Sequence, residues 1–130
     1  MDILINRNFK IWSYSVSHST LILRSPMMFE DQEEYRKELN FNIDIEFSGV
    51  AYIDLPNRIE EIKIREIKDM VPAKFQLYRT IVGLKIFEIK SHKKLYYIVA
   101  SNFVIGKNKW LNEDRVFNMS LEYDEILSFG

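Results

Sequence analysis

The chain contains only two histidines, and each follows a serine at a predicted turn between two strand-like segments. Ser17-His18 separates residues 12–16 from 19–23, and Ser91-His92 separates residues 86–90 from 93–98. A neutral imidazole can serve as a general base or as a metal ligand near neutral pH. His18 is the stronger candidate for such chemistry because serines surround it in the sequence.

The spacing of the histidines argues against both a metal site and a catalytic site. They lie far apart in the chain, whereas metal-binding histidines usually share one element or have a carboxylate close by. A Ser-His-Asp triad built from Ser17, His18 and Asp44 lacks the strained glycine-flanked turn that presents such a serine. The chain has no cysteine, phosphate loop or dinucleotide fingerprint. We therefore expect no metal, no cofactor and no catalysis, and an enzyme that uses His18 is a minor alternative.

Around the first serine-histidine pair, the residue pattern predicts a β-hairpin, closed by a two-residue loop or, because Ser-His suits such a tight turn poorly, by a longer one. The two-residue loop places Tyr14 opposite Leu21 and Trp12 opposite Leu23, so that all four side chains share one face. An exposed aromatic face of this kind is a candidate binding surface, together with His18 at the turn.

Around the second pair, the natural register places Phe87 opposite Ile98 and, on the other face, Ile86 opposite Val99. Because both faces carry apolar side chains, we expect these two strands to be central and covered on both sides.

The most regular strand pattern in the chain lies at residues 41–48. Ile43, Ile45 and Phe47 alternate with the acidic residues Asp44 and Glu46. Strict alternation is typical of a strand with one buried and one solvated face. We expect the three apolar side chains to point into the core and both carboxylates to point into water.

Residues 26–40 break the strand pattern and carry a run of acidic residues. The segment fits either a surface helix of two to three turns or an ordered loop. Five carboxylates make it a candidate surface for electrostatically steered binding; they are Glu30, Asp31, Glu33, Glu34 and Glu38. Further on, alternating apolar residues predict a last strand at 116–123.

The length of 130 residues favours a single domain over residues 1–130. Seven or eight short strand patterns predict an all-β or β-rich α+β fold. The expected architecture is an antiparallel sandwich or a partly open barrel with one or two short helices. The chain shows no βαβ pattern.

Composition limits the partners and the location. The net charge of −1 provides no overall field for nucleic acid, and acidic Glu113 and Asp114 follow the lysines at 90–109. We therefore expect no nucleic-acid partner. The longest apolar stretches are strand-sized, Asp2 stands where an export signal needs positive charge, and cysteine is absent. These features predict a cytoplasmic protein with no membrane association.

Two phrases carry a resemblance, namely Phe-Lys-Ile-Trp-Ser-Tyr-Ser-Val-Ser-His-Ser at 9–19 and Gly-Val-Ala-Tyr-Ile-Asp-Leu-Pro at 49–56. They resemble segments of small uncharacterised bacterial proteins of about this length. Some proteins of that style are similar to immunity proteins of bacterial toxin systems. The resemblance implies a role in binding another protein and carries over no catalytic residue.

Together these features predict a non-catalytic protein-binding module, such as a bacterial immunity or accessory protein. The residues expected to bind the partner are Trp12, Tyr14, His18, Glu30, Glu33 and Glu34. The main alternative is a small-ligand carrier with a cavity enclosed by its sheet. Its lining would include Phe47, Tyr52, Phe87 and Tyr97. The oligomeric state and the partner's identity remain open at this stage.

Overall fold

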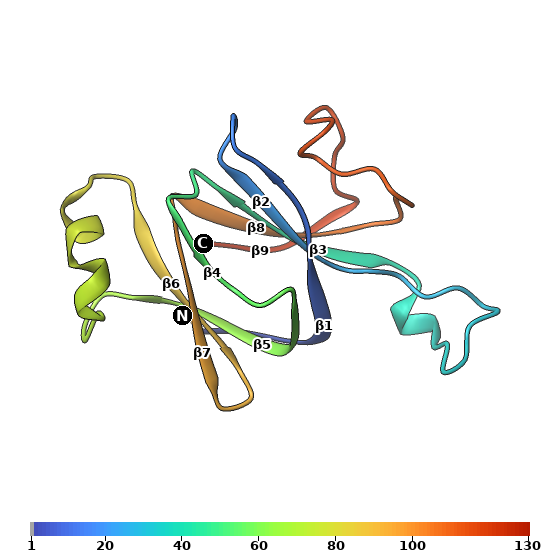
Figure 1. The fold of residues 1–130 in the computed structure, drawn as a ribbon. Helices are drawn as coiled ribbons and strands as arrows, with labels where there is room; N and C mark the ends of the chain where they lie inside the picture. The colour runs from blue at the N-terminus through green and yellow to red at the C-terminus, as the bar shows by residue number, and fades with distance from the viewer. Residues whose placement is uncertain (1) are drawn as a thin grey trace.

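A computed structural model describes residues 2–130, and its main feature is one antiparallel sheet of nine strands that is not closed. The order across the sheet is β4-β7-β6-β5-β1-β2-β3-β8-β9 (Figure 1). The strands are β1 (Asp2–Ser15), β2 (Thr20–Ser25), β3 (Asn42–Ser48), β4 (Tyr52–Asp54), β5 (Arg58–Ile67), β6 (Lys85–Ser91), β7 (Lys94–Ala100), β8 (Asn102–Asn108) and β9 (Glu125–Phe129). Two short 3-10 helices complete the fold, η1 (Lys37–Leu39) and η2 (Ala73–Thr80). The predicted β-rich antiparallel class is confirmed.

The sheet bends sharply where β3 continues into β4 and β7 continues into β8. On one side of this corner β3 pairs with β8, and on the other side β4 pairs with β7. Gly49 makes the bend possible, because it has a φ of +63° and a Cβ there would collide with the Ser101 hydroxyl. Backbone hydrogen bonds continue the pairing through the corner, from Ser101 N to Ser48 O (2.9 Å) and from Ala51 N to Val99 O (2.7 Å).

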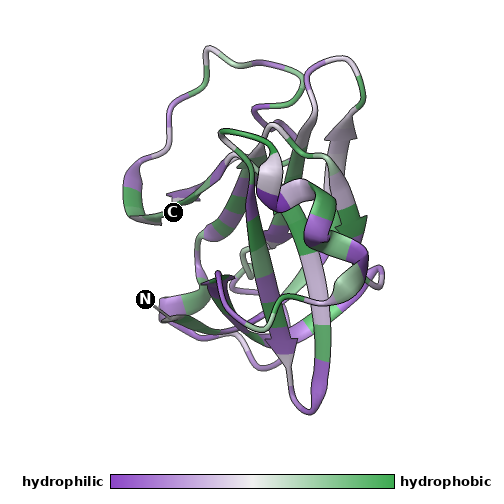
Figure 2. Ribbon diagram, turned by 90° about the vertical axis from the view of Figure 1, so that its left-hand side faces the viewer, coloured by the Kyte–Doolittle hydropathy of each residue, from purple (hydrophilic) through white to green (hydrophobic). Residues whose placement is uncertain are grey.

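The inner face of the bent sheet holds the main hydrophobic core. Phe47 of β3, Phe87 of β6 and Phe103 of β8 are all buried, and their ring centroids lie 5.1–5.9 Å apart. Ile43 and Ile45 point the same way, so the predicted inward face of this strand is confirmed. Figure 2 shows the alternation of hydrophobic and hydrophilic residues along the strands that produces this face.

A second, smaller core lies on the other face of β6 and β7, under η2. Phe75 of η2 is fully buried against Ile86 and Val99. The register of this hairpin is as predicted, with Phe87 opposite Ile98 and Ile86 opposite Val99. The expectation of apolar cover on both faces is therefore confirmed for the end of the hairpin under η2. The expected central position is wrong, because only the three-residue strand β4 lies beyond β7 in the sheet.

The two cores separate the residues expected to line a ligand cavity. Phe47 and Phe87 pack in the main core, whereas Tyr52 and Tyr97 pack against Phe75 in the second, each at a centroid distance of 5.0 Å. These four side chains do not face a common space. The prediction that they line one ligand cavity is therefore wrong.

The first hairpin differs from its predicted register by one residue. Tyr14 lies opposite Leu21 as expected, but Ile11 rather than Trp12 lies opposite Leu23. The cause is a β-bulge at Trp12, between Ile11 and Ser13. The bulge turns the Trp12 ring toward Arg24, on the face away from the main core.

Of the two structures expected for the segment after β2, the ordered loop is the one observed: residues 26–41 contain only η1. The strand predicted at 116–123 is wrong, because these residues are part of a loop that precedes β9. That loop is held in turns by its own polar side chains. Asp114 Oδ1 accepts hydrogen bonds from Val116 N (2.8 Å) and Phe117 N (3.2 Å). Arg115 Nη1 donates to the carbonyls of Met119 and Leu121.

None of the helices within residues 2–130 has the length and apolar character needed to cross a membrane.

The core assignment leads to a stability prediction. Phe47→Ala removes a fully buried ring from the aromatic cluster and should lower the free energy of unfolding by about 3–5 kcal/mol. Phe117→Ala is the matched control, because Phe117 is 85% exposed and its loss should change stability by under about 0.5 kcal/mol. Urea denaturation followed by tryptophan fluorescence measures both. Equal effects of the two variants would contradict the assignment of Phe47 to the core.

Candidate functional site

His18 lies exposed at the β1–β2 turn among hydroxyl groups. Its Nδ1 is 3.2 Å from the hydroxyl oxygens of both Ser15 and Ser17. His92 lies at the β6–β7 turn, with Nε2 3.4 Å from Glu60 Oε2. The two turns lie at opposite ends of the molecule (Figure 1). The histidines therefore do not meet, and the described part of the chain contains no group of three or more potential metal ligands.

The most highly organised polar site lies on the outer face of β2, β3 and β8, away from the main core. Arg24 of β2 and Asp44 of β3 face each other in the register and form a two-pronged ion pair. The Nε–Oδ1 distance is 2.6 Å and the Nη2–Oδ2 distance is 2.8 Å. Both side chains are completely excluded from solvent. Such a pair is favoured when its remaining polar groups are also satisfied. Within residues 2–130 all but one of them are, the exception being Arg24 Nη1, which is buried without a hydrogen-bond partner.

Aromatic rings and a loop carbonyl cover the arginine. The guanidinium carbon lies 4.6 Å from the centre of the Trp12 ring and 6.0 Å from that of Trp110. Arg24 Nη2 also donates to the Glu113 carbonyl at 2.9 Å. The loop 109–124 is thereby attached to the sheet directly above the ion pair. The β-bulge matters here, because it places the Trp12 ring over Arg24.

Two asparagines extend this hydrogen-bond network to loop 26–41. Asn108 Nδ2 donates to Asp44 Oδ2 at 3.0 Å, and Asn42 Nδ2 donates to Asn108 Oδ1 at 2.7 Å. Asn42 also donates to the Trp110 carbonyl and accepts from the backbone N–H of Met27, both at 2.7 Å. The bases of loops 26–41 and 109–124 are thus connected through one buried amide pair.

The predicted exposure of Asp44 and Glu46 is wrong. Both side chains project from the outer face of β3, as the alternation required, but loop 109–124 covers that face and buries them. Burial raises the pKa of the Asp44 carboxyl, and the hydrogen bonds and charge of Arg24 act in the opposite direction. A local strand pattern identifies which face a residue occupies but not whether a distant loop covers that face.

Glu46, the next residue of β3 on the same face as Asp44, holds the end of loop 109–124. Its Oε1 accepts hydrogen bonds from Arg115 Nε at 3.0 Å and from the Tyr123 hydroxyl at 2.7 Å. Burial, with the charge and hydrogen bond of Glu46, raises the pKa of Tyr123, so the phenol keeps its proton and remains a donor. The Tyr123 ring lies on the backbone of β8 at Gly106, where a Cβ would collide with it.

Beside this contact the surface is hollowed between the loop and the edge of the sheet. The hollow has a volume of about 390 Å³. It is lined by Glu46, Val104, Arg115, Glu122, Tyr123 and Ile126. Its floor therefore contains a carboxylate that is only 8% exposed, among apolar and aromatic groups.

Two segments, namely loop 26–41 and residues 109–130 (loop 109–124 together with β9), carry ten of the nineteen acidic residues. Residues 26–41 contain five acidic and two basic side chains, and residues 109–130 contain the same numbers. The rest of the chain has nine acidic and fourteen basic residues. We call these two segments the acidic loops. Loops 26–41 and 109–124 both project on the side of the molecule away from η2 (Figure 1), and Glu30, Glu33 and Glu34 are all exposed in the first.

Large apolar side chains accompany the charge in the second loop and along β9, which ends the sheet. Phe117 is 85% exposed and Phe129 is 77% exposed. Other exposed apolar residues in this region are Leu111, Met119, Ile126 and Leu127. Large exposed apolar side chains are candidates for contact with a partner where they form a contiguous patch. In the first hairpin Tyr14 is also exposed, whereas Trp12 is partly covered and contacts Arg24.

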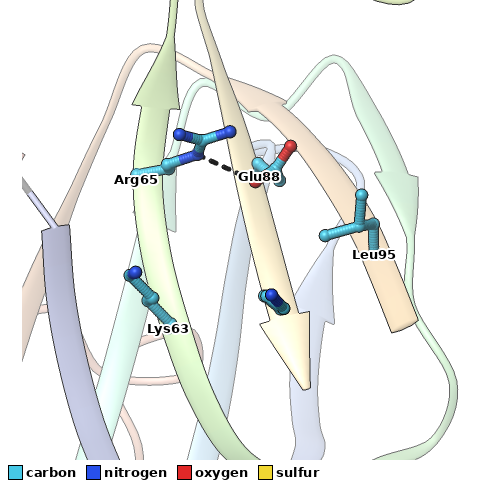
Figure 3. A pocket seen from close by; sticks show the side chains of 5 residues that line it. Lys63, Arg65, Glu88 and Leu95 are labelled. Carbon is cyan, nitrogen blue, oxygen red and sulfur yellow. Dashed lines mark hydrogen bonds and ion pairs between the residues drawn. The ribbon is translucent and has the colours of Figure 1, made fainter. Parts of the chain in front are cut away.

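Other hollows have mixed charge. One of about 250 Å³ lies over β5–β7 and is lined by Lys63, Arg65, Glu88, Lys90 and Leu95. Figure 3 shows that Arg65 turns toward Glu88, and the Nε–Oε1 distance is 2.8 Å. Another of about 480 Å³ lies near His92 and contains Glu60 beside several basic residues. Neither hollow is lined by an ion pair that is fully excluded from solvent, as the Arg24–Asp44 pair is.

No protein family, curated protein or solved structure matches this chain.

Sequence patterns missed Arg24, Asn42, Asn108 and Trp110. One signal was present, because Arg24 is a lone charge that follows the apolar run Leu21-Ile22-Leu23. A charge in such a strand requires a partner of opposite sign. Identifying Asp44 as that partner requires the β2–β3 pairing, which is not local in sequence.

The buried pair leads to the second prediction. Asp44→Asn leaves the Arg24 charge buried without a counter-charge and should lower the free energy of unfolding by about 3–5 kcal/mol. The double variant Arg24→Met/Asp44→Leu removes both charges and should recover most of that loss. Asp31→Asn, on the exposed loop, is the matched control. Urea denaturation measures all three, and a double variant no more stable than Asp44→Asn would show that the cost does not come from the unpaired charge.

Proposed function

We propose that this chain is a non-catalytic protein-binding module, of the toxin-immunity or accessory type, that binds a basic partner protein through its acidic loops. The observation that carries the proposal is the charge asymmetry. Ten of the nineteen acidic residues lie in the two acidic loops, which hold only four of the eighteen basic residues. A region of one charge sign attracts an oppositely charged partner over several ångströms and accelerates association.

The way the loops are anchored supports the same proposal. A binding surface that is already ordered loses less conformational entropy when its partner docks. The second loop is anchored by Arg24, and the base of the first is held by Asn42. Exposed Phe117 and Phe129 add the aromatic area that hot spots of interfaces commonly use.

The two alternatives have less support. A carrier requires a ligand cavity within the sheet, and the main core is filled by the packed rings of Phe47, Phe87 and Phe103. An enzyme that uses His18 requires a carboxylate or a cleft beside it, and the neighbours of its Nδ1 are two serine hydroxyls. A bacterial and cytoplasmic setting is part of the proposal and rests on the resemblance and on the absence of cysteine.

The proposal predicts a salt-dependent interaction that depends on the first acidic loop. The variant Glu30→Gln/Glu33→Gln/Glu34→Gln should fold normally, because these side chains are exposed. It should associate with the partner at least about tenfold more slowly at low salt and with a weaker salt dependence. Affinity capture from bacterial lysate with both proteins as bait identifies a candidate partner, and stopped-flow association at two salt concentrations tests it.

A control that neutralises the same number of charges is available in the β6–β7 hairpin, away from both acidic loops (Figure 1). Lys90→Gln/Lys93→Gln/Lys94→Gln also neutralises three exposed charges and should leave the association rate at or above that of the unmodified protein. Equal retention of all captured proteins by both variants, or the absence of any specifically retained basic protein, would contradict the proposal. Suppression of the partner's toxicity on co-expression distinguishes the immunity type from the accessory type.

A further inference from the structure

We propose that the hollow between β8, β9 and loop 109–124 is a receptor for one basic side chain, lysine or arginine, of the protein partner. This inference rests on the proposed function and assigns it a specific anchoring site. The hollow has a volume of about 390 Å³, which is within the range of ligand pockets, and it opens beside the edge strand β9.

The floor of the hollow contains a carboxylate oxygen that has no partner. Glu46 is 8% exposed, and both of its hydrogen bonds, from Arg115 and Tyr123, are to Oε1. Within residues 2–130, no group donates to Oε2. The Glu46 side chain is 10% exposed and lines the hollow, so its second oxygen can accept a charge-assisted hydrogen bond from an incoming N–H donor.

The charge balance of the lining favours a cation over an anion. Glu46 and Glu122 contribute two negative charges and Arg115 one positive charge. The Arg115 guanidinium is already engaged by Glu46 and by the carbonyls of Met119 and Leu121. One added ammonium or guanidinium therefore makes the lining neutral, whereas an added anion would leave it with two net negative charges.

The apolar part of the lining fits the aliphatic stem of such a side chain. Val104 of β8 and Ile126 of β9 line the hollow, and exposed Phe129 lies directly opposite Val104 in the register. Lysine and arginine commonly lay their methylene groups on apolar surface while the charged group reaches a polar one. A basic segment passing along β9 could place one such side chain on Glu46.

The test uses small probes that carry the side chain alone. N-acetyl-arginine amide and N-acetyl-lysine amide are titrated into the ¹⁵N-labelled protein, and N-acetyl-norleucine amide serves as the neutral control. The basic probes should shift the amide signals of Glu46, Val104 and Ile126 with dissociation constants on the order of 1–10 mM, and the neutral probe should not.

Two variants remove the site in different ways. Glu46→Gln keeps an acceptor for Arg115 and Tyr123 and should weaken binding of the basic probes by about tenfold or more, because a charge-assisted hydrogen bond is lost. If Glu46→Gln fails to fold, Ile126→Arg provides the same test from the exposed edge strand. Its guanidinium should occupy the hollow and prevent the added probes from binding. The amide signals of residues outside the hollow should keep their positions, which shows that the variant is folded.

Three results would overturn the inference: no localised shifts with either basic probe, equal shifts with the neutral probe, or at least tenfold tighter binding of spermidine. The last result would assign the hollow to a free polyamine rather than to a partner side chain. Failure here can be distinguished from failure of the proposed function. If only the inference about the hollow fails, the triple glutamine variant still associates more slowly with the captured partner. If the proposed function fails, the variant associates at the same rate as the unmodified protein.

Discussion

The outer half of this structure depends on one buried interaction, the ion pair between Arg24 and Asp44. Removing two charges from water costs several kcal/mol for each ion, roughly, and a two-pronged contact alone does not offset that cost. The additional groups are therefore essential, and they come from the Trp12 ring, the Glu113 carbonyl and Asn108. Asn108 is the last residue of β8, and Glu113 lies in the loop that follows it. The ion pair therefore depends on the position of this loop, and the loop is in turn held in place by the ion pair.

This mutual dependence gives the acidic loops a defined position. A loop with an excess of like charges repels itself and gains nothing from local propensity, so it stays ordered only if anchored elsewhere. The anchors here lie beneath the charges. Arg24 holds the Glu113 carbonyl, Arg115 joins Glu46 to the loop, and Asn42 connects both loop bases. The buried charged residues Arg24, Asp44 and Glu46 thus fix the position of the acidic side chains at the surface.

How much of the structure the sequence predicts follows from the range of each interaction. The register of the β6–β7 hairpin and the inward face of β3 depend on residues close in the chain, and both were predicted correctly. The first hairpin was wrong by one residue because a bulge at Trp12 serves a contact with Arg24 that is not visible locally. Asp44 was placed on the correct face and assigned the wrong environment, because its cover comes from a loop about seventy positions away. The acidic character of residues 30–38 was visible at once, whereas its proximity to the second acidic loop required the fold.

In the bent sheet, the apolar contacts that stabilise the fold and the polar groups that hold the acidic loops lie in different places. The main core and the cluster under η2 place apolar packing on both faces of β6 and β7, so that half of the sheet is stabilised largely by apolar contacts. The half formed by β2, β3 and β8 has apolar packing on its inner face only. Its outer face is available for polar groups, and the chain uses it to hold Arg24, Asp44 and Glu46 under a loop. Changes in the exposed part of that loop need not affect the main core, so its surface can vary to suit a partner while the fold is preserved.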